Sequence, residues 1–221
     1  MRKYVYIVAA LATAMIAVLP ATSASAASVH VLTIKKVGGP AVAPRAVLKA
    51  GLAPRTSAVF KNSLGKVTCT RSTITEKVIT NPAKTARPAT ARESLTAVTF
   101  SSCKINISGV TVKSLTVANL PYNVTVSDAK GNPVKISERS KAKPLLLTAT
   151  VKFGTSTITC SVKAASIAGT ASNKGNVIAI VTRNFKKASG GSLCPTSGTL
   201  AATYGPVRDT SVKGSPAVFV N

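Results

Sequence analysis

The stretch "KVTCTRSTIT" (residues 66–75) contains the features that decide the fold class. Its residues are mostly β-branched and alternate in polarity, a pattern typical of a half-buried β-strand. Its first half, "KVTCT" (66–70), has a near twin in "TITCS" (157–161). Another cysteine follows each twin at the same distance, Cys103 after Cys69 and Cys194 after Cys160. The spacing therefore suggests two related halves, each with a cysteine-bearing strand.

Segments of the same kind recur along the chain after residue 58. They include "SLTAVTF" (94–100), "VTVKSLTVANL" (110–120), "YNVTVSD" (122–128), "LLLTATVKF" (145–153), "STITCSVKAASIAG" (156–169), "NVIAIVTRNF" (176–185), "GTLAATYG" (198–205) and "AVFVN" (217–221). Turn signals such as "DAKGNP" (128–133) and "NKGN" (173–176) separate them, and no segment sustains a helical period.

This pattern predicts an all-β fold, an antiparallel β-sandwich or barrel with two pseudo-repeats, each with one disulfide. We place the pseudo-repeats at about residues 58–140 and 145–221, within a single domain that spans residues 58–221. Two separate domains are the alternative. We favour one domain because each half alone has few aromatic residues with which to build a core.

Three interpretations compete for the four cysteines: a metal site, a redox couple and two disulfides. Zinc ligands usually come as close C-x-x-C pairs or with histidines nearby, whereas these cysteines are far apart and the one histidine is His30. A redox couple also favours C-x-x-C. We therefore expect disulfides, and neither metal nor cofactor. Four cysteines allow three pairings, of which the equal spacing favours Cys69 with Cys103 and Cys160 with Cys194.

The N-terminus has the layout of a secretory signal peptide. Arg2 and Lys3 precede an apolar run over residues 4–19, and Ala24 and Ala26 occupy the positions before a cleavage site. The run is shorter than the ~20 residues that span a bilayer, and no later stretch is long enough. We expect residues 1–26 to be removed and the mature chain, without a transmembrane segment, to be secreted. It is then either released or held at the cell wall by non-covalent contacts.

Residues 27–57 differ in composition from the chain that follows. They contain "GGP" (38–40) and two copies of "APR" (43–45 and 53–55), and prolines at this density interrupt regular structure. We interpret this part as a flexible basic segment that is open to proteolysis. The sequence does not decide whether it is removed.

Charge is the most unusual property of the composition. The chain has 29 lysines and arginines against 5 aspartates and glutamates, a formal net charge of +24. Such an excess attracts polyanions and favours solubility without determining the fold. The densest cationic stretch lies around "KISERSKAK" (135–143), and it yields the candidate polyanion-binding residues Lys130, Lys135, Arg139, Lys141 and Lys143. Candidate partners are an anionic cell-wall polymer, an anionic membrane surface or DNA, bound without sequence specificity.

Catalytic motifs are scarce. The few acids form no paired motif, and we expect each of them to be a partner for nearby cations. The lone His30 precedes the Pro/Gly-containing segment, so a Ser-Lys site is the one catalytic arrangement that remains open. We therefore expect no enzyme but a monomeric, secreted binding or structural module of unknown ligand. The alternative is a cationic effector that binds extracellular polyanions.

Several phrases resemble a group of exported β-rich proteins of actinobacteria. They are "SLGKVTCT" (63–70), "LTAVTFSSC" (95–103), "VANLPYNVTVSDAKGNP" (117–133), "STITCS" (156–161) and "GTLAATYGPV" (198–207). The resemblance covers about residues 58–221 and implies export and a β-rich fold. The group has no assigned activity, so no catalytic residue carries over. The strongly cationic composition is not expected of the group.

Overall fold

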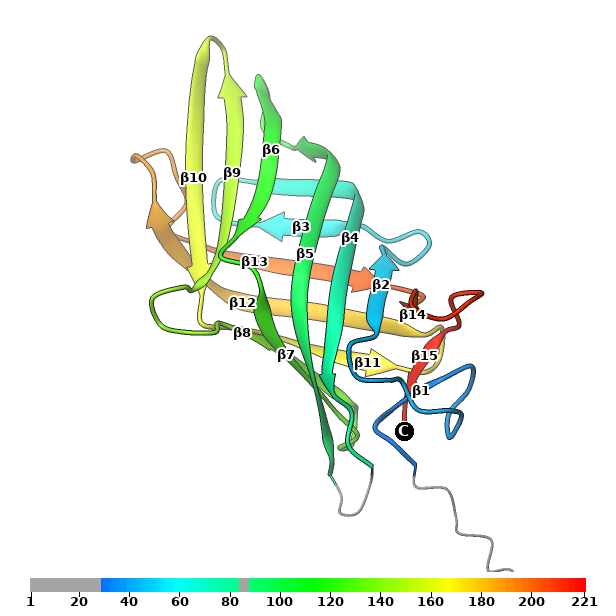
Figure 1. The fold of residues 1–221 in the computed structure, drawn as a ribbon. Helices are drawn as coiled ribbons and strands as arrows, with labels where there is room; N and C mark the ends of the chain where they lie inside the picture. Colours follow the sequence, from blue (N-terminus) through cyan, green and yellow to red (C-terminus); the bar gives the residue numbers. More distant parts are fainter. Residues whose placement is uncertain (1–28, 84–87) are drawn as a thin grey trace, which may run out of the picture.

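The computed structural model describes residues 29–83 and 88–221, which form strands joined by turns and loops (Figure 1). The strands are β1 (Leu32–Ile34), β2 (Val47–Gly51), β3 (Ala58–Lys61), β4 (Lys66–Thr80), β5 (Thr90–Ile105), β6 (Val110–Ala118), β7 (Tyr122–Ser127), β8 (Pro133–Ser137), β9 (Leu145–Phe153), β10 (Ser156–Ala164), β11 (Ser166–Ser172), β12 (Val177–Ser189), β13 (Ser197–Tyr204), β14 (Arg208–Asp209) and β15 (Val218–Val220). The predicted all-β class is confirmed.

Eight strands close into an antiparallel barrel. They are hydrogen-bonded in the order β11, β8, β7, β5, β4, β3, β13 and β12, and β12 pairs with β11 to complete the circle. Of the two architectures expected, the barrel is the one formed. The first-half strands β8, β7, β5, β4 and β3 lie side by side, and the second-half strands β13, β12 and β11 complete the circle. The two halves meet where β3 pairs with β13 and where β8 pairs with β11.

The barrel interior is filled by side chains from alternate strand positions. On β4 the inward positions include Val67, Cys69, Ile74 and Val78, all buried. An eight-stranded barrel is just wide enough for side chains to fill it. The interior accordingly retains a cavity of only about 60 Å³.

Two buried tyrosines fix strands around this core. The Tyr122 hydroxyl accepts a hydrogen bond from the Leu146 backbone N–H at 2.9 Å and donates to the Ala118 carbonyl. The Tyr204 hydroxyl lies 2.8 Å from the hydroxyl of Ser72 on β4. Buried tyrosines usually satisfy their hydroxyl in this way. Both tyrosines lie in phrases that carry the resemblance, and their roles here are structural.

A three-stranded extension leaves the barrel at β12. The first part of β12 pairs with β11, and residues near its end pair with β10, which continues the sheet through β9 to β6. Figure 1 shows the β9–β10 hairpin and β6 rising beyond the barrel. The extension thus continues the sheet beyond the barrel as a three-stranded wall.

The segment before residue 58 is part of the fold, and the expectation of a flexible segment is wrong over its described part, residues 29–57. β1 pairs with β15, and β2 pairs with both β4 and β14. Val31, Leu32 and Val42 are buried, and the Asn81 side chain bonds the backbone of Leu32 and Val42. The prolines lie in turns between short strands, where they interrupt no ladder. The signal-peptide prediction lies outside the described residues.

Both predicted disulfides are present. Cys69 and Cys103 face each other directly on β4 and β5, whereas Cys160 on β10 binds Cys194 in the loop before β13. Two disulfides indicate an extracellular or otherwise oxidising environment. Within the described residues the chain forms no helix that is long and apolar enough to cross a membrane.

Candidate apolar binding cleft

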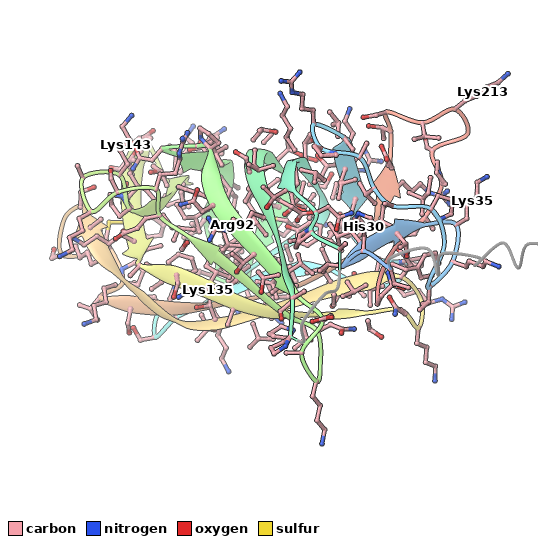
Figure 2. The ribbon with its side chains drawn as sticks, turned by 60° about the horizontal axis from the view of Figure 1, so that its bottom comes forward. His30, Lys35, Arg92, Lys135, Lys143 and Lys213 are labelled. Carbon is pink, nitrogen blue, oxygen red and sulfur yellow. A yellow bond between two sulfur atoms is a disulfide. The ribbon has the colours of Figure 1, made fainter. Side chains whose placement is uncertain are left out.

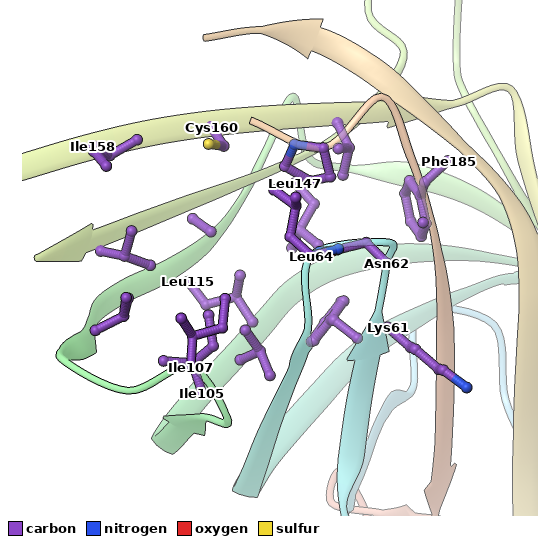
Figure 3. Close-up of a pocket in the computed structure, with 18 of the residues that line it drawn as sticks. Lys61, Asn62, Leu64, Ile105, Ile107, Leu115, Leu147, Ile158, Cys160 and Phe185 are labelled. Atoms are coloured by element: carbon purple, nitrogen blue, oxygen red, sulfur yellow. The ribbon is translucent and has the colours of Figure 1, made fainter. Parts of the chain in front are cut away.

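A cleft of about 380 Å³ lies between the extension and the β3–β4 hairpin (Figure 3). Its lining is mostly apolar and comes from segments that are far apart in the sequence: Phe60, Lys61, Asn62, Leu64, Val67, Ile105, Ile107, Val110, Leu115, Leu147, Ala149, Val151, Phe153, Ile158, Cys160, Val162, Phe185, Leu193, Pro195, Ser197, Gly198 and Thr199. Binding sites for small molecules typically measure about 300–1,000 Å³ and are predominantly apolar. The cleft has both properties.

Strand alternation explains the apolar wall. In "LLLTATVKF" the alternate residues Leu147, Ala149 and Val151 line the cleft, and the intervening positions carry threonine and lysine. Directly opposite residues of an antiparallel pair share one face. Val162 is opposite Leu147, and Cys160 is opposite Ala149, so register places the apolar face of β10 beside that of β9.

The rim of the cleft exposes large apolar side chains. Leu64 is 54% exposed, Phe153 is 52% exposed and Leu193 is 65% exposed. They come from the β3–β4 turn, the end of β9 and the loop before β13, and all three line the cleft. Exposed apolar side chains that gather around one opening mark a binding surface more often than singly scattered ones do.

The second disulfide holds one side of this rim. Cys194 lies between the lining residues Leu193 and Pro195, and its sulfur is bonded to Cys160 on the wall. Cys194 is buried although its neighbour Leu193 is exposed. The bridge therefore attaches a loop of the rim to β10.

A cation lies at the edge of the cleft. Lys61 is among the lining residues, and Figure 3 shows its side chain extending away from the apolar cluster. Lys61 is directly opposite Lys66 in the β3–β4 ladder, and both are exposed. The cleft thus combines an apolar floor with positive charge at one edge.

The candidate polyanion-binding residues lie on β8 and on the segments before and after it. Lys130 lies in the turn before β8, and Lys135 lies on its exposed face, while Arg139, Lys141 and Lys143 follow the strand. Lys135 and Lys143 are well separated in Figure 2. Closeness in the sequence therefore does not bring Lys135 and Lys143 together.

Lys141 alone of the five lines a second hollow, of about 670 Å³, where it is joined by Lys163 and Lys186. Sequence reasoning missed these two lysines because strand pairing, and not closeness in the sequence, brings them together. Their positions could be found only from the register of β10 on β12.

Two glutamates are buried within the barrel. Glu76 on β4 is 3% exposed and Glu93 on β5 is 4% exposed. Both line a small cavity of about 30 Å³, together with Asn173, Asn176 and apolar side chains. The expectation that these acids serve as partners for cations is wrong, because each occupies an inward position and the two carboxyl groups are hydrogen-bonded to each other.

Burial dominates the titration of this pair. Desolvation raises the pKa of Glu76 to about 7, although the hydrogen bond with Glu93 opposes the shift. Desolvation, then the charge of Glu76 and the hydrogen bond with it, raise the pKa of Glu93 well above its ordinary value. The hydrogen bond lowers the pKa of Glu76 and raises that of Glu93, so Glu93 holds the proton and donates it in a hydrogen bond to the Glu76 carboxylate. The sequence does indicate the inward position of Glu76, since Ile74, Glu76 and Val78 alternate along one strand and therefore share one face.

The described residues contain no group of three or more histidine, cysteine, aspartate or glutamate side chains that could hold a metal ion. His30 forms an isolated β-bridge with Ala83 beside β1. The strongest candidate site is therefore the apolar cleft. No family model, no curated protein and no solved structure matches the chain. The choice of the cleft therefore rests on its geometry.

Proposed function

We propose that the protein is a secreted, non-enzymatic binding module that takes the acyl chain of an anionic amphiphile into the cleft between β3–β4 and the β6–β9–β10 wall. The observation that carries the proposal is the apolar cleft of about 380 Å³ with Leu64, Phe153 and Leu193 exposed at its rim. The barrel is a filled scaffold, so the space for a ligand lies beside it.

The chemistry of the lining favours an acyl chain. The wall offers aliphatic side chains, and most backbone polar groups of β9 are engaged in ladders with β10 and β6. Binding of a flexible apolar ligand to such a surface is favoured by about 0.8 kcal/mol of free energy for each methylene that is removed from water. A polar ligand would lose hydration there without gaining partners.

Positive charge at the edge supports an anionic head group. Lys61 lines the edge of the cleft, where its ammonium group is available to the head group of a ligand whose chain occupies the apolar part. The formal net charge of +24 also favours approach of an anionic amphiphile. The signal-peptide pattern, the two disulfides and the resemblance to exported actinobacterial proteins support placing this activity outside the cell.

The proposal can be tested with palmitate and the mature protein in isothermal titration calorimetry. Ala149→Trp adds an indole to the floor of the cleft and should weaken binding by about tenfold or more, since the chain and the ring compete for one space. Val181→Trp is the matched control, because Val181 is 56% exposed on β12 and does not line the cleft.

The head group is tested separately. Lys61→Glu should weaken binding of palmitate while leaving binding of hexadecanol, which has the same chain and no charge, nearly unchanged. Equal affinity of the wild-type protein and Ala149→Trp for palmitate, or no binding of palmitate by the wild-type protein, would refute the proposal. A single palmitate bound per two chains would instead assign the rim to a dimer.

A further inference from the structure

The outer face of the sheet carries a second hollow at the point where β12 changes partner. β10 and β11 are consecutive strands, both of which pair with β12, and Ala165 lies between them. The hollow of about 670 Å³ lies at this fork and is lined by Glu138, Lys141, Pro144, Lys163, Ala164, Ala165, Ser166, Phe185, Lys186 and Ser197.

Register brings two of its lysines face to face. Lys163 on β10 is directly opposite Lys186 on β12, and both side chains are exposed. Like charges directly opposite each other on neighbouring antiparallel strands destabilise the pair. Both lysines line the hollow, so an anion bound there would offset the repulsion between their ammonium groups.

Four further groups complete the polar lining. Lys141 reaches the hollow from the β8–β9 loop, and the hydroxyl-bearing Ser197 is directly opposite Lys186 on β13. Ser166 adds a second hydroxyl, and Glu138 is the one carboxylate among the lining residues. The lysines outnumber that carboxylate, so the hollow retains an excess of positive charge.

We propose that this hollow binds a phosphate group, held by Lys141, Lys163 and Lys186. Ammonium groups bind phosphate by charge-assisted hydrogen bonds, and hydroxyls can donate to its remaining oxygens. A phosphate monoester, with a charge of about −1.5 to −2 near pH 7, offsets the excess of lysines over the single glutamate. The same chemistry serves a terminal phosphate monoester or the repeating phosphodiesters of an anionic polymer.

The site is independent of the apolar cleft. Lys186 and Phe185 are neighbours on β12 and point to opposite faces, because successive strand residues alternate. Phe185 and Ser197 are the two lining residues that both hollows share. Binding of phosphate is therefore expected to persist in Ala149→Trp, and the two proposals can fail separately.

The test measures binding of glycerol phosphate and of poly(glycerol phosphate) at low salt and at ~0.15 M salt, where long-range charge effects are screened. The double variant Lys163→Gln/Lys186→Gln should bind glycerol phosphate about tenfold more weakly than the wild-type protein. Lys135→Gln/Lys213→Gln removes the same charge from exposed positions outside the hollow and is the control.

The outcomes separate the sources and the alternatives. Tighter binding of glycerol phosphate per phosphate supports a terminal monoester, and tighter binding of the polymer supports a phosphodiester chain. Equal losses in the two double variants, or no binding of either probe at ~0.15 M salt, would overturn the site in favour of diffuse charge attraction. Lys141→Gln, in a loop, repeats the test without altering a strand. The melting temperature in the absence of phosphate gives a second readout, since Lys163→Gln alone should raise it by removing the repulsion.

Discussion

The buried carboxyl pair makes the stability of the barrel depend on pH. Glu76 and Glu93 are hydrogen-bonded to each other inside the barrel, and burial raises both pKa values. A group whose pKa is raised by folding binds its proton more tightly in the native state than in the unfolded state. Stability from such a group is complete below the unfolded pKa and is lost as the pH rises through the folded pKa.

The magnitude follows from the shift of Glu76. Its pKa moves from 4.5 to about 7, a difference that corresponds to roughly 3 kcal/mol. The unfolding free energy should therefore fall by roughly 3 kcal/mol from this group alone as the pH rises from about 4.5 to about 7. Glu93 acts in the same direction, because its pKa is also raised. The Asn173 and Asn176 side chains beside the pair carry no charge that would oppose this dependence.

The assay is chemical denaturation of a protein that comprises residues 27–221, at a series of pH values. Glu76→Gln/Glu93→Gln retains an amide pair of similar shape and removes both titrations, so its unfolding free energy should change much less over the same window. Glu138→Gln is the control, because Glu138 lies outside the barrel interior in a partly exposed position. A wild-type protein that becomes more stable as the pH rises, or a double glutamine variant with the wild-type slope, would refute the reasoning.

Three further variants test how the fold is held together and how the cleft is shaped. Cys69→Ala/Cys103→Ala should lower the unfolding free energy by about 3–4 kcal/mol and leave palmitate binding intact, as measured by denaturation and calorimetry. Cys160→Ala/Cys194→Ala should cost a similar stability and also weaken palmitate binding, because it releases one side of the rim; unchanged affinity would contradict this. Tyr204→Phe removes one hydrogen bond and should lower the unfolding free energy by about 1 kcal/mol, and a loss near zero would show that the hydroxyl is not needed.

The β class and both disulfides could be predicted because their signals are local or periodic. Alternation in "KVTCTRSTIT" identifies a strand wherever the strand pairs, and equal spacing identifies the partners Cys69 and Cys103. The same periodicity contained the inward position of Glu76, between Ile74 and Val78. The prediction of a cation partner for Glu76 is wrong because a residue's charge does not show its strand phase, and here the phase places the carboxyl group inside the barrel.

Other features depend on contacts between distant parts of the chain. Val31 and Leu32 are buried only because β1 pairs with β15 at the opposite end of the sequence, so composition alone suggested a flexible segment. The cleft likewise combines residues near 60, 105, 150 and 195, and Lys163 meets Lys186 through register. A short stretch of sequence does not show which distant residues its own residues will contact.

The fork of β12 accounts for both proposed sites. β12 is 13 residues long, and β11 pairs only with its first part, up to Ile180. Beyond the bulge that follows Thr182, β12 pairs on that same edge with β10, so the sheet departs from the barrel while β13 continues along the other edge. A closed, filled barrel has no room for a ligand, but a sheet that leaves it must form an angle with it. The inner side of that angle is the apolar cleft, and the outer side is the lysine-lined hollow, with Phe185 between them.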